Sequence, residues 1–258
     1  MGKITIQGIL YDDKSSFLKG PALAPPLIRE AYHSNSANYW AEDGSYIHPD
    51  LFDDAGDHTI KDYFDISEIT SKQLREGNPM ITLGGDHSIT FPVIQAFHAT
   101  YGLIDILHID AHGDLYENFE GDPYSHACPF FNIMKDGLVK NLYQVGIRTL
   151  NDTQRTNAEK FGVKINEMKD FESFKMPKFK NPLYLSLDLD ALDPAYAPGV
   201  SHHEPGGLST RQVIDIIQKI DAPIVGADIV EYNPTRDIND MTAMVTAKLF
   251  KEIAAKML

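Results

Sequence analysis

The feature that most constrains this chain is a two-residue alternation of acidic and imidazole side chains at the ends of two apolar segments. Asp110, His112 and Asp114 alternate in one segment, and Asp188 and Asp190 repeat the spacing in the other. Side chains two apart on an extended chain point the same way, so each segment directs these groups into one space. Grouped acids in a dry place repel one another unless cations neutralise them. The pattern therefore predicts strand ends that meet around a metal centre.

Short apolar runs bounded by Gly, Asn or Asp alternate with amphipathic stretches along the chain. This order is typical of an α/β protein with a mostly parallel sheet and helices on both faces. At least six strands are predicted, at residues 3–9, 79–83, 104–109, 141–147, 182–189 and 223–230. Residues 31–58 have weaker periodicity and are expected to form mainly surface connections. Because no repeat or linker interrupts the sequence, one domain over residues 1–258 is expected.

The acidic and imidazole clusters each follow a predicted strand, which is where open α/β sheets build their sites. The clusters are residues 84–88, residues 110–114, residues 188–190 and Glu231. They contain six candidate metal ligands: His87, Asp110, His112, Asp114, Asp188 and Asp190. Six ligands are too many for one tetrahedral ion but suit two ions that share bridging carboxylates. Such a pair of ions converts water into a hydroxide nucleophile near neutral pH.

Other polar residues near these clusters are expected to have supporting roles, because Asp and His at strand ends also form turns and caps. Asp86 would point away from its neighbour His87 on an extended chain, which favours turn support. His108 lies deeper in its strand than Asp110, which favours a buried hydrogen bond over ligation. The single cysteine, Cys128, is expected to be a packed or pocket-wall thiol.

Four motifs in a fixed order give the sequence a family resemblance. They are Gly-Gly-Asp-His-Ser at residues 84–88, Asp-Ala-His-Gly-Asp at 110–114, Ser-Leu-Asp-Leu-Asp-Ala-Leu-Asp-Pro at 186–194 and Asp-Ile-Val-Glu-Tyr-Asn-Pro at 228–234. Together they resemble the ureohydrolase family of arginases and agmatinases over nearly the whole chain. The resemblance implies a three-layer α/β/α fold with a central parallel sheet. It also implies a two-manganese centre and hydrolysis of a guanidinium group to urea and an amine.

The same resemblance implies a role for each site residue. His87, Asp110, Asp114 and Asp188 would hold one ion, and Asp110, His112, Asp188 and Asp190 would hold the other. The expected cofactor is two Mn²⁺ per chain, with Co²⁺ or Ni²⁺ as alternatives for such ligands. Asp114 would orient the nucleophile, and Glu231 would pair with the guanidinium nitrogens. His126 matches the histidine that delivers a proton to the leaving amine.

The substrate tail is expected to contact residues outside the ligand motifs. Typical animal and bacterial arginases have a Thr/Ser/Asn-rich loop for the substrate carboxylate, whereas residues 115–124 here include the acids Glu117, Glu120 and Asp122. These acids would repel a carboxylate if they faced the pocket, which favours agmatine. The further candidates for contact with the substrate are Asn118, Asn151, His202, His203 and Glu204.

Arginine remains the alternative substrate. Plant arginases also resemble this chain, through Phe-Glu-Gly at residues 119–121, Val-Ser-His at 200–202 and Glu-Pro-Gly-Gly-Leu-Ser at 204–209. Another guanidino acid is a further possibility, because polar loop residues can serve more than one tail.

The sequence leaves two functions other than guanidinium hydrolysis open. A metal-binding scaffold without turnover would keep the ligands, although the presence of both His126 and Glu231 argues against it. A metal-dependent deacetylase would need one zinc ion, and the paired aspartates followed by Asp193 and Pro194 favour two ions instead.

Composition limits which binding partners and which cellular location are expected. A formal net charge of −14 disfavours nucleic acid and anionic membranes, since binding to either depends on clusters of Lys and Arg. The first residues lack the apolar core of a signal peptide, so a cytoplasmic enzyme is expected. The family resemblance, rather than composition, implies the partners: a small guanidino substrate and further copies of the chain, in a trimer or hexamer.

Overall fold

The computed structural model describes residues 3–74 and 78–258, and its centre is one eight-stranded sheet. The strands are β1 (Ile4–Leu10), β2 (Phe52–Thr59), β3 (Met80–Leu83), β4 (Ile104–Ile109), β5 (Val139–Ile147), β6 (Lys164–Glu167), β7 (Leu183–Asp188) and β8 (Ile224–Val230). Their order across the sheet is β2-β1-β3-β8-β7-β4-β5-β6. All neighbouring pairs are parallel, so the carboxyl ends of the strands meet at one edge.

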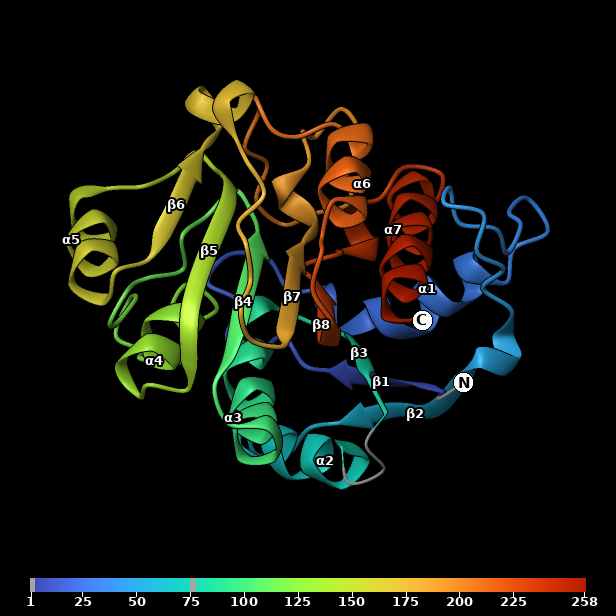
Figure 1. Ribbon diagram of the computed structural model, residues 1–258, viewed down its shortest axis with the longest axis horizontal. Helices are drawn as coiled ribbons and strands as arrows, with labels where there is room; N and C mark the ends of the chain where they lie inside the picture. The colour runs from blue at the N-terminus through green and yellow to red at the C-terminus, as the bar shows by residue number, and fades with distance from the viewer. Residues whose placement is uncertain (1–2, 75–77) are drawn as a thin grey trace.

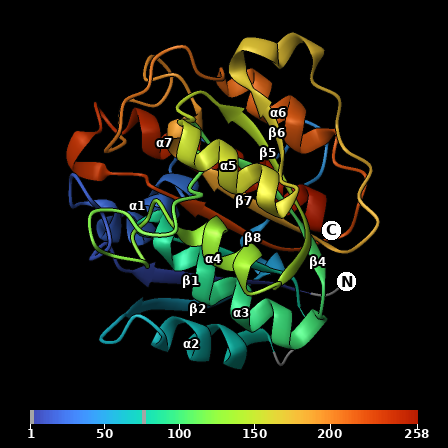
Figure 2. The same cartoon turned by 90° about the vertical axis from the view of Figure 1, so that its left-hand side faces the viewer.

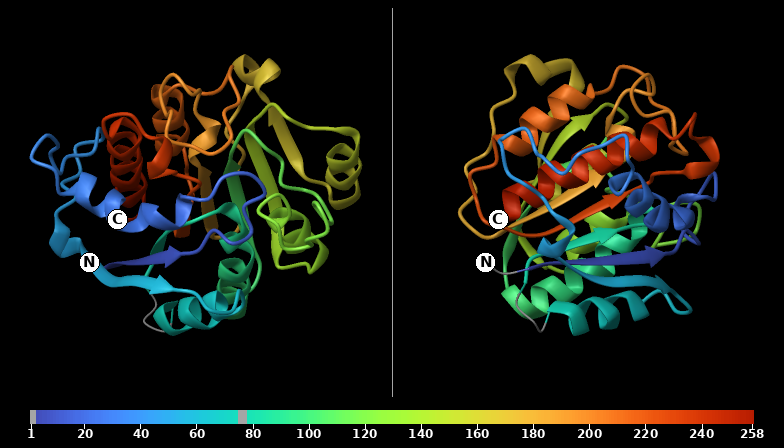
Figure 3. Two further views of the ribbon diagram at one scale, coloured as in Figure 1. Left: turned by 180° about the vertical axis from the view of Figure 1, so that it is seen from behind. Right: turned by 90° about the vertical axis from the view of Figure 1, so that its right-hand side faces the viewer.

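Helices cover both faces of the sheet and make three layers (Figures 1 and 2). The α-helices of the described residues are α1 (Ala24–Tyr32), α2 (Asp65–Leu74), α3 (Thr90–Tyr101), α4 (Pro129–Lys135), α5 (Asp152–Phe161), α6 (Thr210–Gln218) and α7 (Met241–Met257). Helices α2 to α5 follow one another on one face, and α7 packs between α1 and α6 on the other (Figure 3). The expected α/β/α architecture is therefore confirmed, with a wholly parallel sheet.

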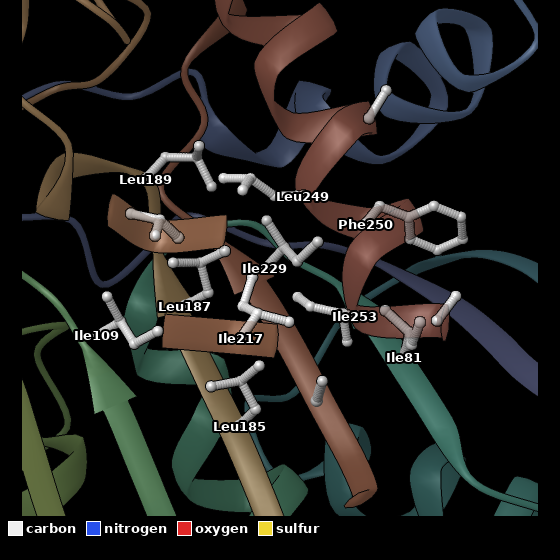
Figure 4. Packing of buried hydrophobic residues seen from close by; sticks show 14 of the residues in the cluster. Ile81, Ile109, Leu185, Leu187, Leu189, Ile217, Ile229, Leu249, Phe250 and Ile253 are labelled. Carbon is white, nitrogen blue, oxygen red and sulfur yellow. The ribbon is translucent and has the colours of Figure 1, made fainter. Parts of the chain in front are cut away.

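Two apolar clusters, one on each face, hold the layers together. Along β7 the side chains alternate between them: Leu185 belongs to the cluster under α6 and α7, and Tyr184 to the cluster under α3. Figure 4 shows Leu185 and Ile229 of the central strands close to Ile217 of α6 and Ile253 of α7. This alternation explains why the central strands have nearly continuous apolar sequences, since both of their faces are buried.

The six predicted strands are all present, with ends within two residues of the predicted positions. The prediction that residues 31–58 form mainly surface connections is wrong from Phe52 onward, because Phe52–Thr59 form β2. This strand lies at one edge of the sheet, and apart from Phe52 its side chains are at least partly exposed, so it has no apolar alternation to detect. The short β6 at the opposite edge, Lys164–Glu167, is also mostly polar. Charged edge strands discourage pairing with other chains.

No helix within residues 3–74 and 78–258 is long and apolar enough to cross a membrane.

Replacing Leu185 with alanine should lower the free energy of unfolding by about 2–5 kcal/mol, because the buried side chain would leave a cavity between β7 and the helices above it. Denaturant unfolding of the metal-free protein measures the change. Leu103→Ala is the matched control, since Leu103 is 46% exposed and its loss should change the free energy by less than about 0.5 kcal/mol. Equal effects at the two positions would contradict this account of the core.

Candidate functional site

The predicted site residues gather at the carboxyl ends of four neighbouring strands. His87 follows β3, Glu231 follows β8, Asp188 ends β7, and Asp110 follows β4. These strands lie side by side in the middle of the sheet, in the order β3-β8-β7-β4. A parallel sheet thus brings together residues that are separated by up to 144 positions in the sequence.

Tight local turns present the side chains at these ends. Asp86 and Asp188 accept hydrogen bonds from the backbone N–H groups of Ser88 and Asp190, and each starts a short 3₁₀ helix, His87–Ile89 and Leu189–Ala191. Asp114 and Glu231 have positive φ angles of 48° and 63°. Such angles are uncommon outside glycine and cluster at functional sites, where the surrounding structure holds them.

His87 lies at the centre of the first group of candidate ligands. Its Nδ1 lies 3.2 Å from Oδ2 of Asp110, 3.2 Å from Oδ2 of Asp114 and 3.0 Å from Oδ2 of Asp188. Despite these distances, Nδ1 has no hydrogen-bond partner among the described residues. Two atoms bound at a right angle, about 2.1 Å from a common ion, are about 3.0 Å apart. The unpartnered nitrogen and its three oxygen neighbours therefore fit a divalent cation.

A second group adjoins the first and shares Asp110. Nδ1 of His112 lies 2.9 Å from Oδ2 of Asp190 and 3.4 Å from Oδ1 of Asp110. Asp110 thus turns one carboxylate oxygen toward each group. The residues of this group could hold a second cation, with Asp110 as a bridge.

The electrostatics of the cluster also favour bound cations. Burial raises the pKa of Asp188 well above its usual range, and the charges of Asp190 and Asp110 raise it further. Burial likewise raises the pKa of Asp190, although His112 opposes the shift. Burial alone would lower the pKa of His87, but the surrounding carboxylates raise it well above its usual value. Divalent ions would relieve the repulsion among these acids.

A chain of hydrogen bonds behind His87 fixes which of its nitrogens faces the acids. Nε2 of His87 lies 3.0 Å from Oγ of Ser186, and that hydroxyl donates to Oδ1 of Asp228 over 2.7 Å. The other oxygen of Asp228 accepts from Tyr184 and Thr90, both at 2.8 Å. Ser186 therefore accepts the Nε2 proton, which leaves Nδ1 free as a ligand. The sequence motifs did not predict this role, although Ser186 shares the strand face of Asp188.

His108 has the buried, hydrogen-bonded position that its depth in β4 suggests. Its Nε2 lies 2.7 Å from Oδ2 of Asp110, and its Nδ1 lies 2.9 Å from Nε2 of Gln144. The ring also stacks on Phe130, with centroids 3.9 Å apart. Both nitrogens are thus engaged, and His108 orients Asp110.

His126 and Glu231 lie together beside the acid cluster. Nδ1 of His126 is 2.9 Å from Oε1 of Glu231, and its Nε2 is 2.8 Å from Oγ of Ser16. Burial alone would lower the pKa of His126, but the charge of Glu231 raises it to about 9. Burial would raise the pKa of Glu231, and His126 holds it below its usual value instead. Ser16 comes from the loop after β1 and has no signal in the local sequence.

That loop is fastened to the site by Asp86, whose side chain accepts from the backbone N–H of Lys14 and the hydroxyl of Ser15. Gly85 allows the close approach, because a Cβ there would lie 1.6 Å from the carbonyl oxygen of Tyr11. Burial, with the charge of Glu231, raises the pKa of Asp86 to about 6.

A cavity of about 260 Å³ opens onto the acids. Its lining includes the candidate ligands and catalytic residues His112, Asp114, Asp188, Asp190, His126 and Glu231. The other lining residues are Ser16, Tyr116, Phe119, Ala127, Thr149, Gln154, His202 and Glu204. The arrangement can hold cations at one end and a cationic group beside Glu231.

Several residues predicted to contact the substrate tail lie outside this lining. Asn118 is exposed and accepts from the backbone of Gly121, Asn151 caps α5, and His203 bonds the carbonyl of Pro198. His202 and Glu204 do line the cavity, and the ring of His202 lies 5.3 Å from that of His126. The contacts of all five with a substrate stay predictions.

The three acids of residues 115–124 also lie outside the lining. Glu117 and Glu120 are exposed, and Asp122 forms a 2.7 Å ion pair with Lys14. The condition on which the preference for agmatine depended is therefore not met. Cys128 is buried near the backbone of Asp122, and burial raises the pKa of its thiol to about 12.

Comparisons with known proteins agree with this geometry. The sequence profile of the arginase family matches residues 2–255. "Arginase 1, mitochondrial" of Arabidopsis thaliana is 45% identical, covering 98% of this chain and 80% of that protein. The solved arginase of Medicago truncatula has a TM-score of 0.93 and 41% identity, covering 99% of this chain and 87% of the other. N(1)-aminopropylagmatine ureohydrolase of Thermus thermophilus is 39% identical over 69% of this chain and 63% of that protein.

The comparisons do not confirm the expected cellular location or the expected oligomeric state, and both stay predictions. The Arabidopsis relative is named as mitochondrial, so the expected cytoplasmic location receives no support from it. The expected trimer or hexamer is likewise untested.

Replacing Ser186 with alanine should weaken binding of Mn²⁺ by about 10- to 100-fold, because the proton on Nε2 of His87 would lose its acceptor. Isothermal titration of the metal-free protein measures the affinity. Ser173→Ala is the matched control, since Ser173 is exposed and bonds only the backbone of Asp170. An unchanged affinity in a normally folded Ser186→Ala protein would rule out this role.

Proposed function

The chain belongs to the arginase family of binuclear metal ureohydrolases, and on that premise we propose that it hydrolyses L-arginine to ornithine and urea. The observation that carries the choice of substrate is that plant arginases match nearly the whole chain at 41–45% identity, whereas solved structures described as agmatinases or agmatine ureohydrolase cover the same length at 25–30% identity. The relative that acts on N(1)-aminopropylagmatine is less similar and matches a shorter part. The position of the loop acids outside the cavity adds support, because nothing in residues 115–124 then repels a carboxylate.

We further propose that the two ions are Mn²⁺. His87, Asp110, Asp114 and Asp188 would hold one ion, and Asp110, His112, Asp188 and Asp190 would hold the other. When bound, the ions supply Lewis acidity and lower the pKa of water. Asp114 would orient the attacking water, since its carboxylate lines the cavity.

Glu231 would bind the guanidinium group of the substrate. Its Oε1 accepts from the backbone N–H of His87 and contacts His126, whereas Oε2 has no hydrogen bond to any group in the described part of the chain. A free carboxylate oxygen at the cavity wall is suited to a planar guanidinium. Holding the cation there fixes the orientation of its carbon toward the acid cluster.

His126 would provide the proton that the leaving amine needs. Since the pKa of its imidazole is raised to about 9, the ring is mostly protonated at neutral pH. Glu231 holds the proton on Nδ1, and Ser16 positions Nε2, whose proton can pass to the amine nitrogen as its bond to carbon breaks. Urea and a protonated amine result.

The substrate is tested by measuring urea release from arginine, agmatine, 4-guanidinobutyrate and 3-guanidinopropionate with the Mn²⁺-loaded protein. Arginine should have the highest kcat/KM, by about tenfold or more. A higher value for agmatine would overturn the choice of arginine. Metal binding without urea release from any guanidine would favour the non-catalytic scaffold.

Glu231→Gln should lower kcat/KM for the preferred guanidine by about 100-fold or more, because the neutral amide cannot pair with the guanidinium charge. Metal content should stay the same, since Glu231 lies outside both groups of candidate ligands. Glu117→Gln is the matched control and should leave both quantities unchanged, because Glu117 is exposed and outside the cavity lining. Loss of metal from Glu231→Gln would instead assign the residue to the metal centre.

A further inference from the structure

Gln154 is a buried amide in the wall of the cavity, and neither the motifs nor the proposed mechanism gives it a role. It lies in the first turn of α5, and only 2% of its surface is exposed. It lines the cavity together with Asp114 and Glu231. A buried amide in a cavity wall usually has hydrogen-bond partners for both of its ends.

Only one end of this amide is engaged. Oε1 of Gln154 accepts from the backbone N–H of Leu115 over 3.3 Å, which fixes the orientation of the amide because Nε2 could not accept that proton. Nε2 donates no hydrogen bond to any group within residues 3–74 and 78–258. The amide therefore keeps a donor for a group that enters the cavity.

Tyr116 offers a second donor on the same lining. Its hydroxyl accepts from Nδ2 of Asn151 over 2.6 Å, and the described residues provide no acceptor for the hydroxyl proton. Thr149 differs, because its hydroxyl donates to the carbonyl of Ala111. Two free donors thus accompany the acids that serve the guanidinium end.

We propose that Gln154 is a specificity-determining residue that donates a hydrogen bond from Nε2 to the carboxylate of the substrate tail. The proposal rests on the guanidinium hydrolysis proposed above and adds how the tail is chosen. The tail of arginine ends in a carboxylate, which accepts hydrogen bonds, whereas the tail of agmatine ends in an ammonium group, which only donates. An unpaired amide donor therefore favours a guanidino acid over a guanidino amine.

The substitution Gln154→Glu tests this directly. Glutamate keeps an oxygen for the N–H of Leu115, removes the donor and adds a negative charge, so the fold should be retained. We expect kcat/KM for arginine to fall roughly 10- to 100-fold, mainly through KM, while the value for agmatine stays constant or rises. Gln154→Met, which adds no charge, should lower the arginine value in the same direction by a smaller factor.

Asn157→Asp is the matched control. Asn157 lies one turn further along α5 and donates to the carbonyl of Leu115, but it does not line the cavity. Its substitution adds the same charge on the same helix and should leave the ratio of arginine to agmatine hydrolysis within about twofold. An equal change of the ratio in Asn157→Asp would overturn the proposal, because charge at a distance would then explain the effect.

Binding of the products separates this proposal from the choice of arginine. Calorimetry with the Mn²⁺-loaded protein should show that Gln154→Glu weakens binding of ornithine and spares putrescine. If 4-guanidinobutyrate proves to be the best substrate and Gln154→Glu selectively impairs it, arginine is the wrong substrate but the role of Gln154 stands. An equal loss for acid and amine ligands, or a wild-type preference for agmatine, would refute that role.

Discussion

The structure depends on placing four nearly buried carboxylates, those of Asp110, Asp114, Asp188 and Asp190, around two imidazoles at one edge of a parallel sheet. Such a group of acids is unfavourable by itself, because burial and mutual repulsion both oppose ionisation. The cost is tolerable where cations complete the site, and the free Nδ1 of His87 shows that the protein alone leaves the arrangement incomplete. The sheet order β3-β8-β7-β4 makes this grouping possible, since only β8 separates β7 from β3, whose end carries His87.

The residues behind the cluster explain how its geometry can be maintained. Asp228 accepts from three hydroxyl groups, and one of these, on Ser186, orients His87. His108 orients Asp110 from the opposite side and is itself fixed by Gln144. These partners come from strands or from helices that pack on the sheet, so the candidate ligands are held by the rigid part of the molecule.

The sequence predicts the candidate ligands in this rigid part well, because the alternation that reveals them lies within short segments of the chain. Alternation within residues 110–114 and at Asp188 and Asp190 identifies one strand face, and parallel strands bring such faces to the same edge. Strand β2 was missed because an edge strand need not be apolar. Ser16 was missed for another reason: its contact with His126 joins loops that are 110 residues apart, and no periodicity in either loop predicts their approach.

The preference for agmatine also depended on contacts between distant parts of the chain, which the sequence does not reveal. Three acids in residues 115–124 suggested a cavity that repels carboxylates, but a charge affects the substrate strongly only if it faces the cavity or lies in a dry place. Glu117 and Glu120 point to solvent, and Lys14 neutralises Asp122. The neutral amide of Gln154, on a helix that begins 37 residues after Leu115, lines the cavity instead. Unpartnered donors in the cavity wall therefore predict which substrate tail the site accepts better than the net charge of the nearest loop does.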